Sequence, residues 1–490
     1  MVKRLTPSDA LFLYSESREQ MMHVAGLMPF TPAPDSPPDL LRRQMDELRS
    51  APPVCSPWNL KLSTPNLLWN PLQTWVEERA IDLEYHIRRS ALPSPGDERE
   101  LGILVSRLHG YRVDLRRPPW EVHFIEGLER GRFAWYAKIH HSLVDGYSAM
   151  QAMTNALSSD PDERDRPLFF SIPPKAKQKP PASPEAAAPA PPASPEAAAA
   201  APADTGEHEA GSRGIHFPEL LGAVREQYGA SKAVIRALVN MIQSSRAGDH
   251  QLVSPLEAPR CLFNARISRS RRFATQILAL DRLRTIARVA GGTLNDVVLA
   301  LSAASLRTYL VEQEALPTAP LVAMVPVAIR AKDELGGGNA VGAILATLAT
   351  DVADPAERLA RIAASTARAK AQLQGMSKAA ILQYSALITA PSMLQVIPGA
   401  AGHLRPPFNI VISNVPGPDR PLYFRGARLE AWYPMSIPIH GQAVNITCTS
   451  YAGQVCFGFT GCRDTVPHLQ RLAVYCGEAL SELEHAVLHA

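Results

Sequence analysis

A stretch rich in proline and alanine divides the chain into two unequal halves. Twelve prolines lie between Pro161 and Pro202, and the nine-residue sequence PPASPEAAA occurs twice within this stretch. Such a composition offers too little apolar surface to offset the entropy lost on ordering, and its prolines favour extended conformations. We therefore expect a linker over residues 165–212, an N-terminal domain over residues 1–164 and a C-terminal domain over residues 213–490, with an active site between the two domains.

Length and charge indicate a globular chain that does not bind nucleic acid. With 490 residues, of which 46% are hydrophobic, the chain is too long for a single core. The 50 Lys and Arg residues nearly balance the 47 Asp and Glu residues, so no dense basic surface is expected. One basic cluster, Arg269-Ser270-Arg271-Arg272, is either a solvated edge or a contact for anionic lipid or the phosphates of a cofactor.

The cysteines and the apolar segments indicate a cytoplasmic protein. The six cysteines show no paired or metal-like spacing and are expected to be reduced thiols. The first seven residues carry positive charge without an apolar run behind them, so we expect no secretory signal. The segment most like a membrane span, from Ala379 to Ala401, is interrupted by glutamine and proline. It is either a buried helix or a peripheral contact with a membrane or lipid droplet.

Two strands and a helix are predicted in the N-terminal half. Residues 121–128 and 132–140 have the composition of strands and are joined by a short turn, Glu129-Arg130-Gly131. After Gly146 the apolar residues follow helical spacing. The motif His-His-Ser-Leu-Val-Asp-Gly, residues 140–146, is therefore predicted to lie where a strand gives way to a helix.

The C-terminal half also mixes both kinds of element. Residues 280–290 are predicted to form a helix, and a second helix is predicted to begin at Thr293 and run through Leu310, with Thr293 and Asn295 as capping residues. Strands are predicted at residues 320–329, 341–349, 408–414 and 444–451. Mixed elements in both halves predict an α/β protein of two sandwich domains.

Alternation along the second strand separates the two histidines of the motif. The side chains of Phe133, Trp135, Ala137, Ile139 and His141 share one face, whereas those of Tyr136, Lys138 and His140 share the other. His141 is therefore predicted to point with the apolar set. A half-buried imidazole in such a place stays neutral near pH 7 and can take a proton from a hydroxyl group. We predict that His141 is a general base and that His140 is structural.

The rest of the motif allows more than one interpretation. Asp145 either pairs with an arginine to brace the loop, which we favour, or orients a ring nitrogen of the histidine. Gly146 is expected to allow a tight turn and to leave room for a substrate. The two histidines could instead be satisfied in a core, or could ligate a metal. We expect no metal, because the other twelve histidines do not form a second cluster of ligands.

The sequence resembles the bacterial wax ester synthase/diacylglycerol acyltransferase family over nearly the whole chain outside the linker. The motif at residues 140–146 is shared by a wider superfamily of CoA-dependent acyltransferases and peptide-condensation domains. The narrower features of the family are Leu5-Thr6-Pro7-Ser8-Asp9, Met22-His23-Val24, Arg117-Pro118-Pro119-Trp120-Glu121, Gly292-Thr293-Leu294-Asn295-Asp296-Val297-Val298, Pro326-Val327-Ala328-Ile329-Arg330, Gly338-Asn339 and Ile412-Ser413-Asn414-Val415-Pro416-Gly417-Pro418. Pro119 departs from the leucine common in the family, which puts only the local backbone geometry in doubt.

The resemblance implies a fold and a set of site residues. The fold would be two chloramphenicol-acetyltransferase-like domains with the active site in a tunnel between them. His141 would be the base, and the Asn-Asp pair of the family corresponds to Asn295 and Asp296. The amide of Asn295 is suited to hold the thioester carbonyl or its developing negative charge, although a helix cap is an equal alternative. The tunnel would be lined by Trp120, Asn414, Pro416 and Gly417. Packing is the better explanation for Trp120, whereas a plain turn explains the other three residues equally well.

The expected function is the transfer of a long-chain acyl group from acyl-CoA to diacylglycerol, to a long-chain alcohol, or to both. No nucleophile motif is present, so we expect direct transfer without an acyl-enzyme, with acyl-CoA as a co-substrate and no other cofactor. The enzyme would associate peripherally with the inner face of the plasma membrane or with lipid inclusions. Two alternatives are a condensation-type N-acyltransferase and a non-enzymatic lipid-binding or lipid-droplet protein. The sequence does not rank the two acceptors.

Overall fold

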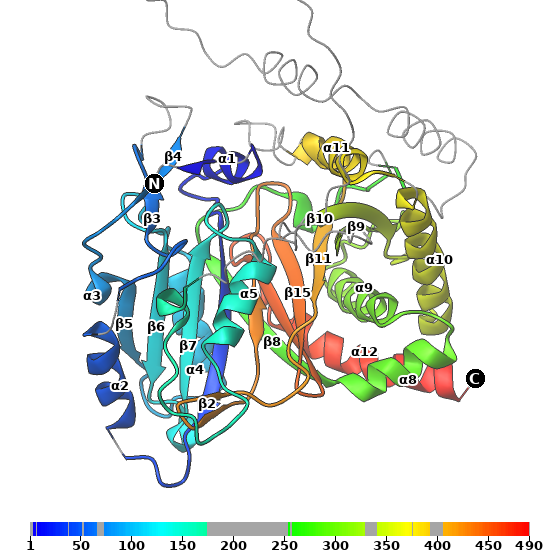
Figure 1. The fold of residues 1–490 in the computed structure, drawn as a ribbon. Coiled ribbons are helices and arrows are strands. Elements are labelled where there is room, and N and C mark those ends of the chain that lie inside the picture. Colours follow the sequence, from blue (N-terminus) through cyan, green and yellow to red (C-terminus); the bar gives the residue numbers. More distant parts are fainter. Residues whose placement is uncertain are drawn as a thin grey trace, which may run out of the picture.

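The protein folds into two α/β lobes, each built on one large mixed sheet (Figure 1). The structure is a computed structural model. It describes residues 3–5, 7–37, 39–50, 53–65, 73–173, 253–254, 257–328, 341–374, 376–392 and 405–489. The predicted linker beyond residue 173, the predicted start of the C-terminal domain at residue 213, and the family residues Gly338 and Asn339 lie outside this description.

The N-terminal lobe is built on a seven-stranded sheet with the order β12-β13-β2-β7-β6-β5, in which β14 also pairs with β2. Its strands are β2 (His23–Thr31), β5 (Ile87–Ala91), β6 (Trp120–Glu126), β7 (Phe133–His140), β12 (Tyr423–Phe424), β13 (Ala427–Leu429) and β14 (Tyr433–Met435). β6 and β7 pair antiparallel, and the turn between them has positive φ at Arg130 (62°) and Gly131 (70°). The predicted hairpin is confirmed.

The N-terminal sheet is completed by strands from the other half of the chain. β12, β13 and β14 lie far beyond the linker in sequence, yet β13 and β14 both pair with β2. They cover the backbone groups along that side of β2, which would otherwise be an open sheet edge. The division of the sequence at the linker is therefore not the division between the two sheets.

The first residues of the predicted linker belong to the core of the N-terminal lobe. A 3-10 turn, η2 (Phe169–Ser171), follows Leu168, and Leu168, Phe169 and Phe170 are at most 2% exposed. Phe169 packs edge-on against Trp58, with ring centroids 4.6 Å apart. The prediction that the linker begins at residue 165 is wrong. Burial of these three apolar side chains stabilises this part of the chain in the N-terminal lobe, although prolines surround it in the sequence.

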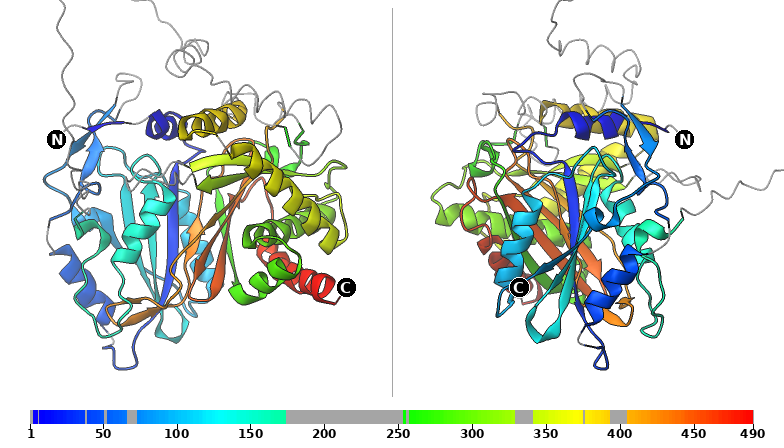
Figure 2. Two further views of the ribbon diagram at one scale, coloured as in Figure 1. Left: turned by 45° about the vertical axis from the view of Figure 1, so that its right-hand side comes forward. Right: turned by 90° about the vertical axis from the view of Figure 1, so that its left-hand side faces the viewer.

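Helices cover both faces of the N-terminal sheet. They are α2 (Leu40–Arg49), α3 (Leu83–His86), α4 (Glu98–His109) and α5 (Gly146–Asn155). The carboxylate of Asp97 caps α4 by accepting a hydrogen bond from the Glu100 N–H. α4 packs on the side that faces the C-terminal lobe, and α5 lies on the opposite side (Figures 1 and 2). A further short helix, α1 (Pro7–Tyr14), lies near a small sheet of β1 (Lys3–Arg4), β4 (Thr74–Glu77) and β3 (Leu60–Leu62).

The C-terminal lobe is built on a six-stranded sheet with the order β10-β9-β11-β15-β16-β8. Its strands are β8 (Arg271–Ala279), β9 (Val322–Ala328), β10 (Val341–Thr347), β11 (Ile410–Val415), β15 (Val444–Tyr451) and β16 (Gln454–Cys462). Its helices are α8 (Leu280–Val289), α9 (Leu294–Glu312), α10 (Pro355–Leu373), α11 (Lys378–Thr389) and α12 (Arg471–Leu488). A 3-10 turn, η3 (Leu262–Asn264), precedes β8. The two helices and four strands predicted in this half are confirmed.

Helix α9 occupies the core of the C-terminal lobe. Among the described residues it alone is long and apolar enough to cross a membrane, but 72% of that apolar window is buried. It packs against α8, α10 and α12. α9 is therefore a core helix, and its apolar sequence is explained by packing.

The two lobes meet along α4 and β14. The Phe273 N–H of β8 donates a hydrogen bond to the Ser106 hydroxyl of α4 at 3.0 Å. β14 approaches β16 so closely that a Cβ added at Gly458 would lie 1.9 Å from the carbonyl oxygen of Pro434. Glycine is thus required at this point, because any side chain would push the two backbones apart. These contacts place the edge strand of the C-terminal sheet against the N-terminal lobe.

Candidate active site

The histidine motif lies where β7 ends and α5 begins, as predicted. β7 ends at His140 and α5 begins at Gly146. Asp145 is the N-cap of α5: its carboxylate accepts hydrogen bonds from the Ser148 N–H at 2.8 Å and from the Ser148 hydroxyl at 2.9 Å. In the part of the chain that the structure describes, no arginine pairs with Asp145. Asp145 does brace the loop, but through a helix cap and not through the predicted arginine.

His141 is held between the strand and α1. Its backbone N–H donates to the Met22 carbonyl oxygen at 2.8 Å. Its ring stacks on Phe12, with centroids 4.1 Å apart and an angle of 19° between the rings. The side chain is half-buried. Burial lowers the pKa of His141 below its ordinary value, although Asp145 and Asp9 partly oppose this effect. The imidazole is therefore neutral at pH 7, the form in which it can accept a proton.

His140 is fully buried and has partners on both ring nitrogens. Nδ1 lies 2.7 Å from the Ser142 hydroxyl and 3.2 Å from the Ser142 N–H, while Nε2 lies 2.6 Å from Oε2 of Glu16. A backbone N–H can only donate, so Nδ1 is the acceptor and Nε2 carries the proton that is donated to Glu16. The structural role predicted for His140 fits this arrangement.

Glu16 is a partner of the motif that the sequence did not indicate. It follows α1 by two residues, and its side chain is 4% exposed. Its second oxygen, Oε1, lies 3.4 Å from Nε of Arg112. Because Glu16 lies between two serines in a region without periodicity, only the three-dimensional contact identifies it.

A layer of buried polar side chains extends from His140 along the same face of β7. Lys138 is 1% exposed and lies 3.3 Å from the carboxylate of Glu121. Its ammonium also donates to the carbonyl oxygens of Leu108 and Tyr111 at the end of α4. Glu121 has its pKa lowered to about 2, since its hydrogen bond with His123 and the charge of Lys138 outweigh the effect of burial.

The histidines of this layer are held neutral. His109 lies 2.9 Å from the Tyr136 hydroxyl, and burial lowers the pKa of His109 to about 3. Burial also lowers the pKa of His23 and of His123. The polar face of β7 predicted by alternation is thus turned towards α4, and not towards solvent.

Gly146 does not make the tight turn that we predicted. It is the first residue of α5, and it is absent from the residues with positive φ. A Cβ added there would meet nothing within 4 Å. The open space beside the motif fits the other part of the prediction, room for a substrate.

The Asn-Asp pair lies in the first turn of α9. Thr293 is the N-cap, and Asp296 completes the capping box by accepting from the Thr293 N–H at 2.8 Å. The other oxygen of Asp296 accepts a hydrogen bond from the Thr366 hydroxyl. Asn295 is half-buried and is not a cap, contrary to the prediction. Asp296 therefore stabilises the helix, whereas within the described part of the chain no hydrogen bond engages the side-chain amide of Asn295.

Trp120 belongs to the core of the N-terminal lobe. It has no exposed surface, its indole N–H donates to the Trp58 carbonyl oxygen at 2.7 Å, and its ring stacks on that of His86. A side chain without accessible surface does not line a tunnel. Of the two alternatives for Trp120, packing is correct.

The segment after β11 is fixed by contacts with β15. A Cβ added at Gly417 would lie 2.3 Å from the Ser450 carbonyl oxygen, and the Gly417 N–H donates to the Ser450 hydroxyl at 3.1 Å. Asn414 accepts a weak hydrogen bond from the Cys448 thiol, and Pro416 is exposed. The close approach of the two backbones explains why residue 417 is a glycine. That Asn414, Pro416 and Gly417 line a tunnel stays a prediction.

The described residues hold no group of three or more His, Cys, Asp or Glu side chains that could bind a metal ion. All six cysteines are free thiols.

Comparison with known proteins agrees with this architecture. Residues 5–298 match the model of the wax ester synthase/diacylglycerol acyltransferase catalytic domain, and residues 337–484 match the model of the WS/DGAT C-terminal domain. The chain is 51% identical to a putative diacylglycerol O-acyltransferase of Mycobacterium tuberculosis, over 99% of this chain and 97% of the relative.

Solved structures extend the comparison. The wax ester synthase/diacylglycerol acyltransferase from Marinobacter aquaeolei VT8 is similar with a TM-score of 0.75 and 39% identity, over 98% of both chains. The first condensation domain of the calcium-dependent antibiotic synthetase has a TM-score of 0.56 at 16% identity, over 99% of this chain and 96% of that one, a likeness of fold alone. The predicted α/β fold of two chloramphenicol-acetyltransferase-like lobes is confirmed. The chain belongs to the wax ester synthase/diacylglycerol acyltransferase family of acyltransferases.

Proposed function

We propose that the protein transfers a long-chain acyl group from acyl-CoA to the hydroxyl group of diacylglycerol, of a long-chain alcohol, or of both, with His141 as the general base. The observation that carries this proposal is the state of His141: a half-buried, neutral imidazole that stacks on Phe12, on a residue whose backbone N–H donates to the Met22 carbonyl oxygen. A base for this reaction must be neutral and partly accessible at the operating pH.

The proposed reaction is a direct transfer. Nε2 or Nδ1 of His141 removes the hydroxyl proton as the oxygen attacks the thioester carbonyl, so that a C–O bond forms. The C–S bond then breaks, and the imidazolium returns the proton to the CoA thiolate. Asn295 would donate its amide to the carbonyl oxygen, where negative charge develops. A positioned base contributes on the order of 10²- to 10⁴-fold to such a reaction.

The other motif residues support the base. The Asp145 cap and the His140–Glu16 hydrogen bond fix the two ends of the loop that carries His141. Holding reacting groups in a productive geometry is itself a large part of catalysis. Neither residue needs to touch the substrate for this role.

The proposal is tested by thiol release from palmitoyl-CoA with hexadecanol, with dioleoylglycerol, and with neither. We expect His141→Ala to lose nearly all acceptor-dependent release while the protein remains folded. His485→Ala, at an exposed histidine of α12, is the matched control and should retain full activity. A folded His141→Ala protein with most of its turnover would refute the assignment, and equal release without acceptor would indicate a thioesterase. The two acceptor arms also rank the substrates.

We further propose that the enzyme works at a lipid surface, at the inner face of the plasma membrane or on lipid inclusions. α1 and α11 lie close together at one end of the molecule in each view (Figures 1 and 2). Both expose large apolar side chains: Leu11 (44%) and Tyr14 (47%) on α1, and Leu382 (42%) and Leu387 (46%) on α11. The opposite face of α11 is buried through Ile381 and Ile388. The alternative of a buried helix therefore fits one face of α11, and the alternative of a peripheral membrane contact fits the other. Its residues 393–401 lie outside the described chain.

A further inference from the structure

Residues 12–22, here called the strap, comprise the last turn of α1 and the segment that leads from it to β2, and they touch both histidines of the motif. Phe12 stacks on the ring of His141, Glu16 accepts a hydrogen bond from the His140 ring, and the Met22 carbonyl oxygen accepts one from the backbone N–H of His141. The placement of both rings therefore depends on where this single segment lies.

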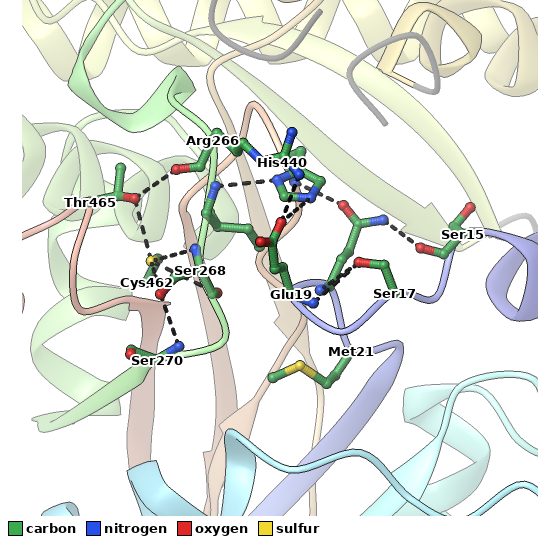
Figure 3. A network of polar contacts seen from close by, with 12 residues as sticks. Ser15, Ser17, Glu19, Met21, Arg266, Ser268, Ser270, His440, Cys462 and Thr465 are labelled. Carbon is green, nitrogen blue, oxygen red and sulfur yellow. Dashed lines mark hydrogen bonds and ion pairs between the residues drawn. The ribbon is translucent and has the colours of Figure 1, made fainter. Parts of the chain in front are cut away.

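The strap is bound to the C-terminal lobe by a network of polar contacts (Figure 3). The Gln20 side chain accepts a hydrogen bond from the His440 N–H at 2.9 Å and donates to the Ser15 carbonyl oxygen at 2.7 Å. Arg266 lies 2.9 Å from the Glu19 carboxylate, but half of its side chain is exposed and the pair is screened by solvent. The buried contact through Gln20 is the stronger restraint of the two.

Arg271, at the start of β8, provides a second buried restraint. It is 5% exposed and donates to the carbonyl oxygens of Ser268 and Ser270 in its own lobe. Its other nitrogen donates to the Glu19 carbonyl oxygen of the strap and contacts the Met21 sulfur. The expectation of a solvated edge is thus wrong for this member of the basic cluster.

Arg271 is a buried cation that is held by backbone oxygens and not by an ion pair. Within the described residues no carboxylate forms an ion pair with it. Burial lowers the pKa of Arg271 to about 10, so the guanidinium is still protonated at neutral pH. Burying a cation is costly unless its hydrogen-bond donors are satisfied. Here they are satisfied by backbone oxygens from both lobes, an arrangement that needs the planar fork of arginine.

We propose that Arg271 is a positioning residue, through which the C-terminal lobe fixes the strap and thereby sets the placement of both motif histidines. The proposal rests on the proposed role of His141 as the base. It differs from a purely structural role because it predicts a change at His141 itself. The titratable groups that face His141 are Asp145, Asp9 and His140, and substitution of Arg271 alters none of them directly.

The test is Arg271→Lys in the full-length protein. Lysine keeps the charge but cannot reach the carbonyl oxygens of both lobes at once. We expect kcat to fall on the order of 10- to 100-fold, as for a small misplacement of a catalytic group, with KM little changed. A displaced Phe12 would also expose the His141 ring to water. The pKa of His141 should then rise towards its ordinary value, measured by NMR titration of histidine-labelled protein, with the His141 signal assigned from its loss in His141→Ala.

Two further variants keep the test decisive. Gln20→Leu removes the other buried link and should give the same pair of changes, even if Arg271→Lys fails to fold. Arg358→Lys is the matched control, because Arg358 is also 4% exposed and donates to backbone oxygens, those of Val352 and Ala353 in its own lobe. It should lower stability and leave the pKa of His141 unchanged.

The inference is overturned if Arg271→Lys and Gln20→Leu keep both wild-type kcat and the wild-type His141 pKa, or if Arg358→Lys shifts that pKa equally. A failure of the proposed function would look different, since it would appear as full turnover in His141→Ala. The pKa of His141 could still be measured in the wild type and in the Arg271 and Gln20 variants, so the two failures can be told apart.

Discussion

Oε2 of Glu16 lies 2.6 Å from Nε2 of His140, although the two residues are 124 positions apart in the sequence. Both side chains are almost completely buried. Because Nδ1 of His140 already accepts from Ser142, this contact fixes one tautomer of the first motif histidine and ties the end of β7 to the strap. The first histidine of the motif is thus occupied in holding the loop, and only the second is available for the proposed role of base.

Glu16→Ala should lower both stability and activity. It leaves the buried Nε2–H of His140 without an acceptor, which costs about 1–3 kcal/mol of unfolding free energy. Glu16→Gln retains an acceptor oxygen and should lose less of both. Urea denaturation and acyl transfer measure the two effects. Glu357→Ala, at a 53% exposed glutamate paired with the equally exposed Arg361, is the control and should change neither by much. Equal behaviour of Glu16→Ala and Glu357→Ala would contradict the prediction.

The buried histidines predict a loss of stability in mild acid. The pKa values of His23, His109 and His123 are lowered in the folded protein, that of His109 to about 3. Below the ordinary value of about 6.5 the unfolded chain takes up protons that the folded chain does not. Each such histidine therefore lowers stability as the pH falls below about 6.5, and His109 does so by about 1.4 kcal/mol per pH unit. For His109 this loss continues until the pH approaches about 3.

Urea midpoints measured from pH 7.5 down to pH 4.5 test this slope. His109→Gln should reduce it by the share of one histidine, whatever its effect on absolute stability. His485→Gln, at an exposed site, should leave the slope as it is. A stability that stays level between pH 7 and pH 5 would show that these histidines titrate normally.

The sequence predicted the elements whose patterns are local. Alternation identified β7 and separated His140 from His141, and helical spacing with a threonine cap identified α9. Both depend on residues within a few positions of one another, where periodicity follows from the geometry of the element. The same argument placed the motif at the junction of β7 and α5.

The contacts that the sequence did not predict join distant segments. β13 and β14 pair with β2 across about four hundred residues, and no local pattern specifies the partner of an edge strand. Glu16 was missed for the same reason. Leu168, Phe169 and Phe170 were assigned to the linker because a window dominated by proline and alanine conceals three apolar residues.

Replacing Lys138 should destabilise the N-terminal lobe strongly. Lys138→Met leaves the buried carboxylate of Glu121 and the carbonyl oxygens of Leu108 and Tyr111 without their cation, at a cost of about 3–5 kcal/mol. The double variant Lys138→Met with Glu121→Gln should recover part of this loss, because no unpaired charge is then buried. The exposed pair of Arg43 and Asp39 serves as the control and should be worth about 1 kcal/mol or less. Urea denaturation gives all three values, and a double variant weaker than the single one would argue against the pair.

Polar substitutions on α1 and α11 should weaken binding to lipid surfaces. Leu11→Ser, Leu382→Ser and Leu387→Ser together remove apolar area at one end of the molecule, and we expect affinity to fall at least about tenfold. Flotation with liposomes that contain dioleoylglycerol measures the change. The matched control is Val289→Ser, Val311→Ser and Val474→Ser, at residues equally exposed but on α8, α9 and α12. Equal binding by both triple variants and the wild type would show that α1 and α11 do not form the lipid-binding surface.

Two substitutions of Asp145 distinguish bracing of the loop from electrostatic support of His141. Asp145→Asn can still accept from the Ser148 N–H and should keep the cap of α5, whereas Asp145→Ala should lose about 1 kcal/mol of stability. Both variants remove a negative charge that raises the pKa of His141. That pKa should fall further, and the acid limb of the rate profile should move to lower pH. If bracing is the main role, Asp145→Asn keeps most of its activity at pH 7.5 while Asp145→Ala does not. Equal loss of activity in both variants, with the cap of α5 intact in Asp145→Asn, would instead assign the carboxylate charge a direct part in the proton transfer.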